Sequence, residues 1–221
     1  LTGILKPEKV KRSRCAAGHK CMWAEEWGGY PSEEFLAELH PQMADIRSHL
    51  PLQTYTNDQK VGTLSTEWAS KLGLSTEVVI SAGIVDAHAA AIGAGIKPGT
   101  MVKIIGTSTC DIVVAPKKQI EKKGIPGISG QVDGSVLPGL IGIEAGQAAF
   151  GDVYAWFKKI LSWTINELDL PDKNEIIDNI LLRLNKEANK IPIEQSTLVS
   201  LDWLNGRRSP HSDPTKKGII S

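Results

Sequence analysis

Residues 78–109, VVISAGIVDAHAAAIGAGIKPGTMVKIIGTST, decide how this chain is built. Apolar, partly β-branched runs at 78–82 and 101–105 are bounded by glycine, as is typical of buried strands in a covered α/β sheet. The small residues at 87–95 between them predict a helix, which a Pro-Gly pair then ends. The stretch therefore predicts an α/β fold.

One acid and one glycine turn follow the two predicted strands. Asp86 lies after the first strand, near the sheet edge where open α/β folds bind ligands. It is a candidate general base, although an Asp directly before a helix also serves as its cap. Gly106, Thr107 and Ser108 follow the second strand, and backbone N–H groups of such a turn can face phosphate. The alternative for these three residues is a plain β-turn.

Further motifs occur in a fixed order along residues 12–213. They are SRCAAGHKCMW at 13–23, GIVDAHAAAIGAGI with GTST at 83–109, GIEAGQAAFGD at 142–152 and LDWLNGRRSP at 201–210. This ordered set resembles the FGGY carbohydrate kinases, and within them the L-ribulokinase branch. DAH or GTST alone would be a weak signal, whereas the set spans nearly the whole chain.

The resemblance implies an actin-like ATPase (ribonuclease H-like) fold and ATP-dependent phosphorylation of L-ribulose to L-ribulose 5-phosphate. ATP and Mg²⁺ are the cofactors it implies, and a small ketose is the partner. No Mg²⁺ ligand is assigned. Homo-oligomerisation is left open.

The resemblance also implies roles for individual residues. Asp86 would be the catalytic base and, with Lys20 and Glu144, a contact of the sugar, while residues 106–108 would contact ATP. From the residues alone, Lys20 in a predicted loop is also consistent with simple solvation. Glu144 is equally consistent with an acid that opens a predicted helix at 147–161 and interacts with its dipole.

The Pro-Gly break at 96–99 predicts a domain boundary. Residues 1–97 would be the end of a sugar-binding domain and residues 98–221 the start of a nucleotide-binding domain, with Asp86 and the glycine turn facing one cleft. An ordinary helix-to-strand loop is the alternative. Against the family pattern we expect an internal segment, which lacks two further nucleotide-contacting turns and is inactive alone.

Composition narrows the class of protein. Lys and Arg number 25, as do Asp and Glu, among 221 residues, which argues against nucleic acid as a partner. No apolar run approaches the roughly 20 residues of a membrane span. The cysteines at 15, 21 and 110 form no C-x-x-C pattern, which favours a reducing cytoplasm. His19 and His88 lack metal-ligand spacing, so we expect them to pack or to hydrogen-bond.

The remaining elements follow from local patterns. Ser32 is expected to cap a helix that reaches residue 50 and is split by Pro41, and a second helix should run from 65 to 72. Residues 1–31 read as loop with short elements. The other expected elements are a strand at 111–115, a turn at 133–134, a helix opened by residues 171–172 and a buried strand at 198–201.

Three alternatives to L-ribulose phosphorylation remain at this point. Another ketose, such as xylulose, could be the substrate, because specificity depends on few pocket contacts. A non-catalytic sugar-binding module would keep Lys20 and Glu144 without nucleotide dependence. A glycoside hydrolase would need the carboxylates of Asp86 and Glu144 about 5–10 Å apart.

Overall fold

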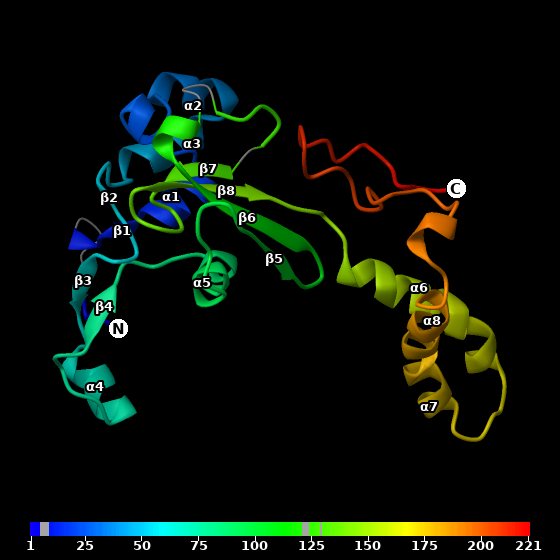
Figure 1. Cartoon of the computed structure of the whole chain (residues 1–221). Helices are drawn as coiled ribbons and strands as arrows, with labels where there is room; N and C mark the ends of the chain where they lie inside the picture. Colours follow the sequence, from blue (N-terminus) through cyan, green and yellow to red (C-terminus); the bar gives the residue numbers. More distant parts are fainter. Residues whose placement is uncertain (5–8, 121–123, 129) are drawn as a thin grey trace. The chain divides into compact units, whose positions relative to one another are not determined.

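The computed structural model describes residues 1–4, 9–120, 124–128 and 130–221 (Figure 1). The chain divides into two compact units. Unit 1 comprises Leu1–Ile104 and Asp111–Ala145, and unit 2 comprises Ile105–Cys110 and Gly146–Ser221. The units do not follow the expected boundary at 97/98, which stays a prediction.

Unit 1 combines short helices with three sheets. Its helices are α1 (Arg14–Cys21), α2 (Glu33–Leu39), α3 (Pro41–Ser48), α4 (Thr66–Leu72) and α5 (Asp86–Gly93), with 3-10 turns η2 (Glu25–Trp27) and η3 (Lys117–Gln119). Its strands are β1 (Arg12–Ser13), β2 (Thr54–Tyr55), β3 (Lys60–Thr63), β4 (Val79–Ser81), β5 (Met101–Ile105), β6 (Thr109–Pro116), β7 (Gly130–Asp133) and β8 (Leu140–Ala145). The ends of β5 and β6 that flank the glycine turn belong to unit 2.

A four-stranded sheet positions the functional side chains of unit 1. Its strand order is β5-β6-β8-β7, and β8 pairs antiparallel with both β6 and β7. Glu144 of β8 is therefore opposite Ile112 on one side and Gly130 on the other. Helix α1 packs on β7 at Gly18, where an added Cβ would overlap the methyl groups of Val132.

Several predicted elements are confirmed. Ser32 caps α2 by accepting a hydrogen bond from the Phe35 N–H, and Pro41 begins the separate helix α3. Ser65 caps α4, which ends at Gly73 in the left-handed conformation. In these places the local cap and breaker chemistry was sufficient to predict the ends of the helices.

Two predictions about local structure are wrong. Lys20 was expected in a loop, within a stretch of loop and short elements, but residues 14–21 form helix α1, whose N-cap Ser13 accepts from the Ala16 N–H. Glu144 does not open a helix, because it lies within β8, and the following helix α6 begins only at Gly151. A dipole interaction of Glu144 with that helix is therefore not its role.

The predicted strands near 78–82 and 101–105 form, but they are not buried as expected. Val79 of β4 is 58% exposed and Met101 of β5 is 62% exposed. β4 is exposed because it pairs with β3 in a separate two-stranded sheet, and not with the four-stranded sheet. Such a small sheet offers few apolar side chains for packing.

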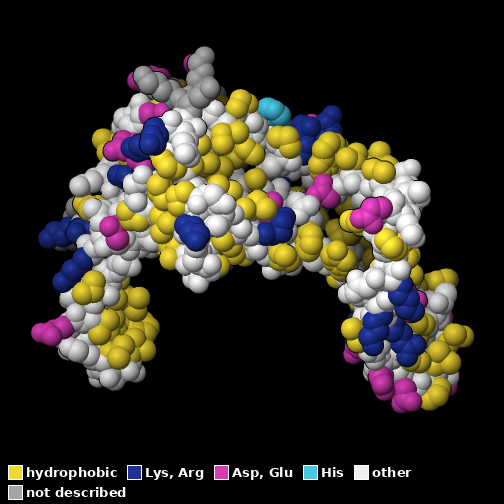
Figure 2. All heavy atoms as spheres, in the orientation of Figure 1, with side chains coloured by type: hydrophobic (Ala, Val, Ile, Leu, Met, Phe, Trp, Pro, Cys, Tyr) yellow, Lys and Arg dark blue, Asp and Glu magenta, His cyan; other side chains and the backbone are white. Residues whose placement is uncertain are grey.

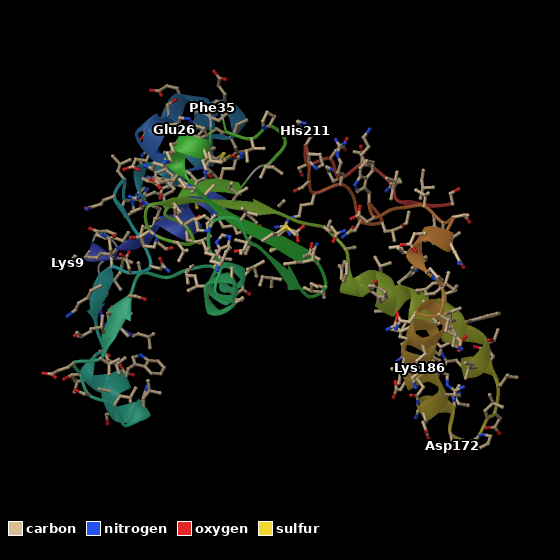
Figure 3. All side chains as sticks on the ribbon, viewed as in Figure 1. Lys9, Glu26, Phe35, Asp172, Lys186 and His211 are labelled. Atoms are coloured by element: carbon tan, nitrogen blue, oxygen red, sulfur yellow. The ribbon has the colours of Figure 1, made fainter. Side chains whose placement is uncertain are left out.

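Unit 2 is mainly helical. It contains α6 (Gly151–Glu167), α7 (Lys173–Asp178), α8 (Ile180–Ala188), the 3-10 turn η4 (Ile193–Gln195) and the strand pair β9 (Ser200–Leu201) and β10 (Ile219–Ile220). Asp172, labelled in Figure 3, is the N-cap residue of α7, as the sequence indicated. The strand at 198–201 was expected to be buried, and this is wrong. Leu198 is 73% exposed, and among the described residues β9 pairs only with β10. Within the described part of the chain, no helix is long and apolar enough to cross a membrane.

Candidate active site

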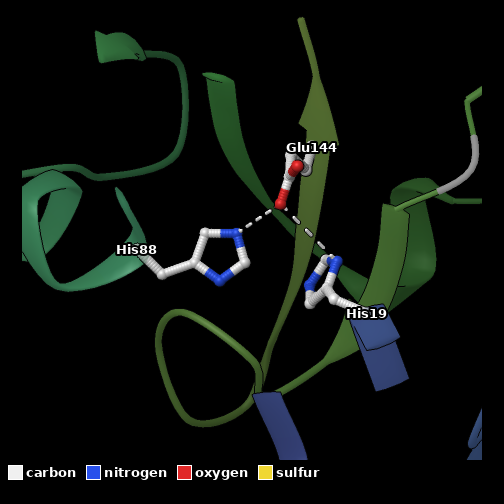
Figure 4. Close-up of side chains that lie close together, drawn as sticks. All are labelled: His19, His88 and Glu144. Carbon is white, nitrogen blue, oxygen red and sulfur yellow. Dashed lines mark ion pairs between the residues drawn. The ribbon is translucent and has the colours of Figure 1, made fainter. Parts of the chain in front are cut away.

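Glu144 is at the centre of a buried cluster in unit 1 (Figure 4). Its Oε2 lies 3.1 Å from Nε2 of His88 and 3.9 Å from Nδ1 of His19. His88 is fully buried, and Glu144 is 8% exposed. The two imidazole rings meet edge to face with centroids 4.6 Å apart. The sequence spacing did not indicate this cluster, because its members come from α1, α5 and β8.

The second ring nitrogen of each histidine is also held. His19 Nε2 lies 3.0 Å from the Ser135 hydroxyl, and His88 Nδ1 lies 2.9 Å from the Cys15 sulfur. These contacts confirm the prediction that both histidines hydrogen-bond. They also fix the ring planes, so that the opposite nitrogens face Glu144.

A glycine makes room for the cluster. A Cβ at Gly130 would lie 2.9 Å from Cβ of Glu144 and 3.0 Å from Nδ1 of His19. Real Cβ atoms do not approach so closely, and a larger residue there would displace both side chains. Gly130 therefore belongs to the site even though it offers no side chain to a ligand.

The two histidines differ in their protonation. Burial, and then the His88 charge, lower the pKa of His19 to about 4, although Glu144 opposes this. Burial also opposes a charge on His88, but its contacts with Cys15 and Glu144 outweigh burial and raise its pKa to about 9. At neutral pH the cluster thus pairs a His88 cation with the Glu144 carboxylate, beside a neutral His19.

The same three side chains could in principle hold a metal ion. One ligand atom from each lies within 4.8 Å of the others. Two histidines and one glutamate are a known ligand set for zinc. The direct contact of His88 with Glu144 gives a second account of the same geometry, in which the two side chains form an ion pair.

Asp86 lies at the exposed start of α5. It is the first residue of the helix, the N-cap position is Val85, and Oδ1 accepts a hydrogen bond from the Ala87 N–H over 2.8 Å. Asp86 is therefore not the N-cap residue that the sequence offered as its alternative role, although its carboxylate accepts from one N–H of the first turn. The exposed carboxylate is also open to a substrate.

Lys20 is exposed in the last turn of α1, not in the loop that the sequence indicated. It directly follows His19 and contributes to the low pKa of that residue. Asp86 likewise lies close in sequence to the cluster, two residues before His88. The roles of Lys20 and Asp86 as sugar contacts stay predictions.

The predicted phosphate turn of unit 2 is held against the start of α6. The N–H groups of Phe150 and Gly151 donate to the carbonyls of Thr107 and Gly106, at 2.8 and 3.0 Å. A Cβ at Gly106 would meet only the Ser108 carbonyl oxygen, at 3.9 Å, so the turn leaves open space beside its first residue. A glycine turn with an exposed Thr107 and a half-buried Ser108 could contact a phosphate group.

A polar network that the sequence did not reveal supports this turn. Buried Thr109, the next residue, accepts a hydrogen bond from the Gln147 N–H over 2.9 Å, and Gln147 in turn donates to Asp202. The guanidinium of Arg208 donates to the Thr109 carbonyl over 3.0 Å. The DWLNGRR loop, whose role the sequence left open, is thus the support of the strand after the turn.

A cavity of about 360 Å³ lies elsewhere in unit 1, between Trp23, Lys117 and Asp133. Lys117 contacts Asp133 and, over 3.6 Å, Glu25. Among the described residues that line this cavity there is none of the predicted site residues.

Relatives of this chain are known. Residues 101–221 match the C-terminal domain of the FGGY family of carbohydrate kinases. A ribulokinase of Vibrio parahaemolyticus is 44% identical over 220 residues, which cover 97% of this chain and 39% of that protein. A ribulokinase of Bacillus licheniformis is 35% identical over 212 residues, which cover 95% of this chain and 37% of that protein. The chain thus spans under two fifths of the length of these relatives.

Solved structures share the fold. A xylulose kinase from Rhodospirillum rubrum matches with a TM-score of 0.59 at 22% identity, over 81% of this chain and 33% of its own. A ligand-bound xylulose kinase from Lactobacillus acidophilus matches with a TM-score of 0.57 at 17% identity, over 81% and 34%. These likenesses confirm the predicted actin-like α/β fold. The family match covers more than half of the chain, and the chain accordingly belongs to the FGGY family of carbohydrate kinases.

Proposed function

We propose that this chain is part of an ATP-dependent kinase that phosphorylates L-ribulose to L-ribulose 5-phosphate. The observation that carries the proposal is the match to ribulokinases over 95–97% of the chain. The motifs with Lys20, Asp86, Glu144 and the glycine turn lie within that match. Family membership also removes the reason to treat Asp86 and Glu144 as a glycosidase pair.

In the proposed reaction the side chains of unit 1 bind the ketose. Lys20 donates to sugar oxygens, and the Glu144 carboxylate accepts from sugar hydroxyls. The exposed Asp86 carboxylate orients the attacking hydroxyl and takes its proton. Because the transition state of phosphoryl transfer is loose, positioning of the hydroxyl contributes as much as proton removal.

In unit 2 the glycine turn and the hydroxyls of Thr107 and Ser108 would contact the nucleotide phosphates. ATP supplies the transferred phosphoryl group when bound, and Mg²⁺ accompanies it to neutralise charge. The hydrogen bonds from Phe150 and Gly151 and the contact of Arg208 with Thr109 hold the backbone near the turn in place. Such fixed donors need no reorganisation as charge develops.

The test uses a hybrid kinase, defined as the Vibrio parahaemolyticus ribulokinase with its matching segment replaced by this chain. ADP release is measured with L-ribulose, D-xylulose and other ketoses, and the parent enzyme is the control. We expect the highest kcat/KM with L-ribulose. A folded hybrid, verified by circular dichroism, that prefers another ketose would correct the substrate. A folded hybrid that turns over no ketose would contradict the proposal.

A further inference from the structure

The contacts of Glu144 lead beyond its role as a sugar contact. A carboxylate taken out of water requires a partner, since an unpaired buried charge is strongly unfavourable. One such partner is His88, whose Nε2 lies 3.1 Å from Oε2, and His19 is more distant, with Nδ1 at 3.9 Å. A carboxylate has about four lone-pair sites, so these contacts are compatible with further hydrogen bonds to a ligand.

His88 also links three elements of unit 1. It belongs to α5, its Nδ1 meets Cys15 of α1, and its Nε2 meets Glu144 of β8. Asp86 lies two residues before it on the same helix, and Lys20 lies on the same helix as Cys15. A displacement of the His88 ring would therefore be transmitted to the elements that carry every predicted sugar contact.

We propose that His88 is a positioning residue, which holds the Glu144 carboxylate charged and oriented for a sugar hydroxyl and ties it to the helix of Asp86. This inference rests on the proposed sugar contact of Glu144. His88 itself is fully buried, so no atom of its ring is open to a ligand. The inference requires that the effect of His88 on binding passes mainly through Glu144, which a comparison of single and double variants can test.

The groups that contact His88 determine which interactions each variant would lose. Cys15, Glu144 and His19 face the ring, and Lys20 follows next to His19. Asn in place of His88 keeps an amide near the Nδ1 position on the Cys15 side but has no group at Nε2. Gln places its amide near Nε2 and keeps a donor toward Glu144. The matched control is His211→Asn, since His211 is an exposed histidine of unit 2.

The first measurement needs no enzymatic activity. Histidine side-chain titrations of the 221-residue chain are followed by NMR with ¹⁵N labelling. We expect His88 to titrate well above His19 in the unmodified chain, and Glu144→Gln to move the His88 midpoint downward by at least about one pH unit. An unchanged His88 midpoint in Glu144→Gln would overturn the inference.

The second measurement is L-ribulose binding to the same chain, followed by chemical-shift changes. We expect His88→Asn to weaken binding about tenfold, His88→Gln to weaken it less, and His211→Asn to leave it unchanged. In the Glu144→Gln background, His88→Asn should add no more than about a twofold loss. An equal loss in both backgrounds would show that His88 acts independently of Glu144 and would overturn the inference.

Two outcomes separate this inference from other accounts. If L-ribulose shifts no signal of the unmodified chain, the sugar-contact proposal fails, and the titration alone decides whether His88 holds Glu144.

Zinc chloride is added in a parallel titration. If zinc shifts His19 and His88 together at equimolar amounts, and fails to do so in Glu144→Gln, the cluster is a metal site and the positioning role is overturned.

Discussion

Asp86 and His88 show how two roles share one turn of helix α5. Each residue of a helix advances by about 100°, so two residues apart means nearly opposite faces. Asp86 is accordingly exposed, whereas His88 is fully buried against Cys15 and Glu144. The DAH motif identified the acid from the sequence. It could not identify the partners of the histidine, because these come from distant elements that only the fold brings together.

The carboxylate of Asp86 is expected to act in the chemical step. Asp86→Asn in the hybrid kinase should lower kcat about 10²–10⁴-fold, because the amide cannot accept the hydroxyl proton. The amide oxygen can still accept from the Ala87 N–H, so the melting temperature should not change. Steady-state kinetics and thermal melts check both. Near-normal kcat would remove Asp86 from the role of base.

Lys20 is expected to bind sugar rather than nucleotide. Lys20→Ala in the hybrid kinase should raise the KM for L-ribulose about 5- to 100-fold, since the loss of a hydrogen bond to a bound hydroxyl costs about 1–3 kcal/mol. The KM for ATP should stay within about twofold. Lys186→Ala, an exposed lysine of α8, is the control. Equal losses for sugar and ATP would assign Lys20 to the scaffold.

The histidine pair predicts a stability maximum near neutral pH. Between about pH 6.5 and 9 the unfolded chain releases the His88 proton while the folded chain keeps it, so stability falls as pH rises. Between about pH 6.5 and 4 the unfolded chain protonates His19 and the folded chain does not, so stability falls as pH falls. Across each of these two pH ranges the free energy of unfolding should fall by about 1–3 kcal/mol.

Urea unfolding of the chain across pH 4–9 measures the loss of stability toward acid pH and the loss toward alkaline pH. His88→Asn should abolish the loss of stability toward pH 9 and reduce the loss toward pH 4, because it also removes a charge that lowers the pKa of His19. His211→Asn should change neither. If His88→Asn still loses stability toward pH 9, that loss does not come from the protonation of His88.

Among the elements, helices were predicted best where their ends carry specific chemistry. Ser32, Ser65 and Gly73 marked their ends correctly. The region of Glu144 was predicted incorrectly, because apolar and small residues suit a helix and a central strand equally. Glu144 belongs to a strand because β8 pairs with β6 and β7. The Gln147 N–H donates to the Thr109 hydroxyl, and no helix begins there.

Close packing of β7 against the cluster predicts that Gly130 is intolerant of change. Gly130→Ala should destabilise the chain by about 1–3 kcal/mol, because the new Cβ meets Glu144 and His19 at 2.9 and 3.0 Å. Gly93→Ala, at the end of α5 in open space, is the control and should be neutral or stabilising by up to about 1 kcal/mol. Urea unfolding compares them. Equal stability of the two variants would mean that the strand and helix adjust freely.

At the scale of the whole molecule, apolar side chains remain at the surface of unit 2. Figure 2 shows hydrophobic side chains among the surface atoms, and on α6 the exposed fractions reach 50% for Trp156 and 65% for Trp163. The sequence predicted a helix at 147–161 and another from 171–172 onward. Which part of that apolar surface would be covered depends on tertiary contacts that no local pattern encodes.

This surface predicts self-association of the 221-residue chain. Light scattering should show a mass above 23.9 kDa that increases with protein concentration. Replacement of Trp156 and Trp163 by Gln should lower the average mass, whereas Lys186→Ala should not. A monodisperse monomer at all concentrations would contradict the prediction.

Unit 2 is discontinuous, since Ile105–Cys110 is separated in sequence from Gly146–Ser221. The glycine turn and the helix start that holds it are thus encoded far apart, on either side of residues that belong to unit 1. A gene rearrangement with one breakpoint between residues 110 and 146 would separate the turn from its support. Only an exchange that preserves both segments could pass this unit intact from one protein to another, so the two segments should be inherited together.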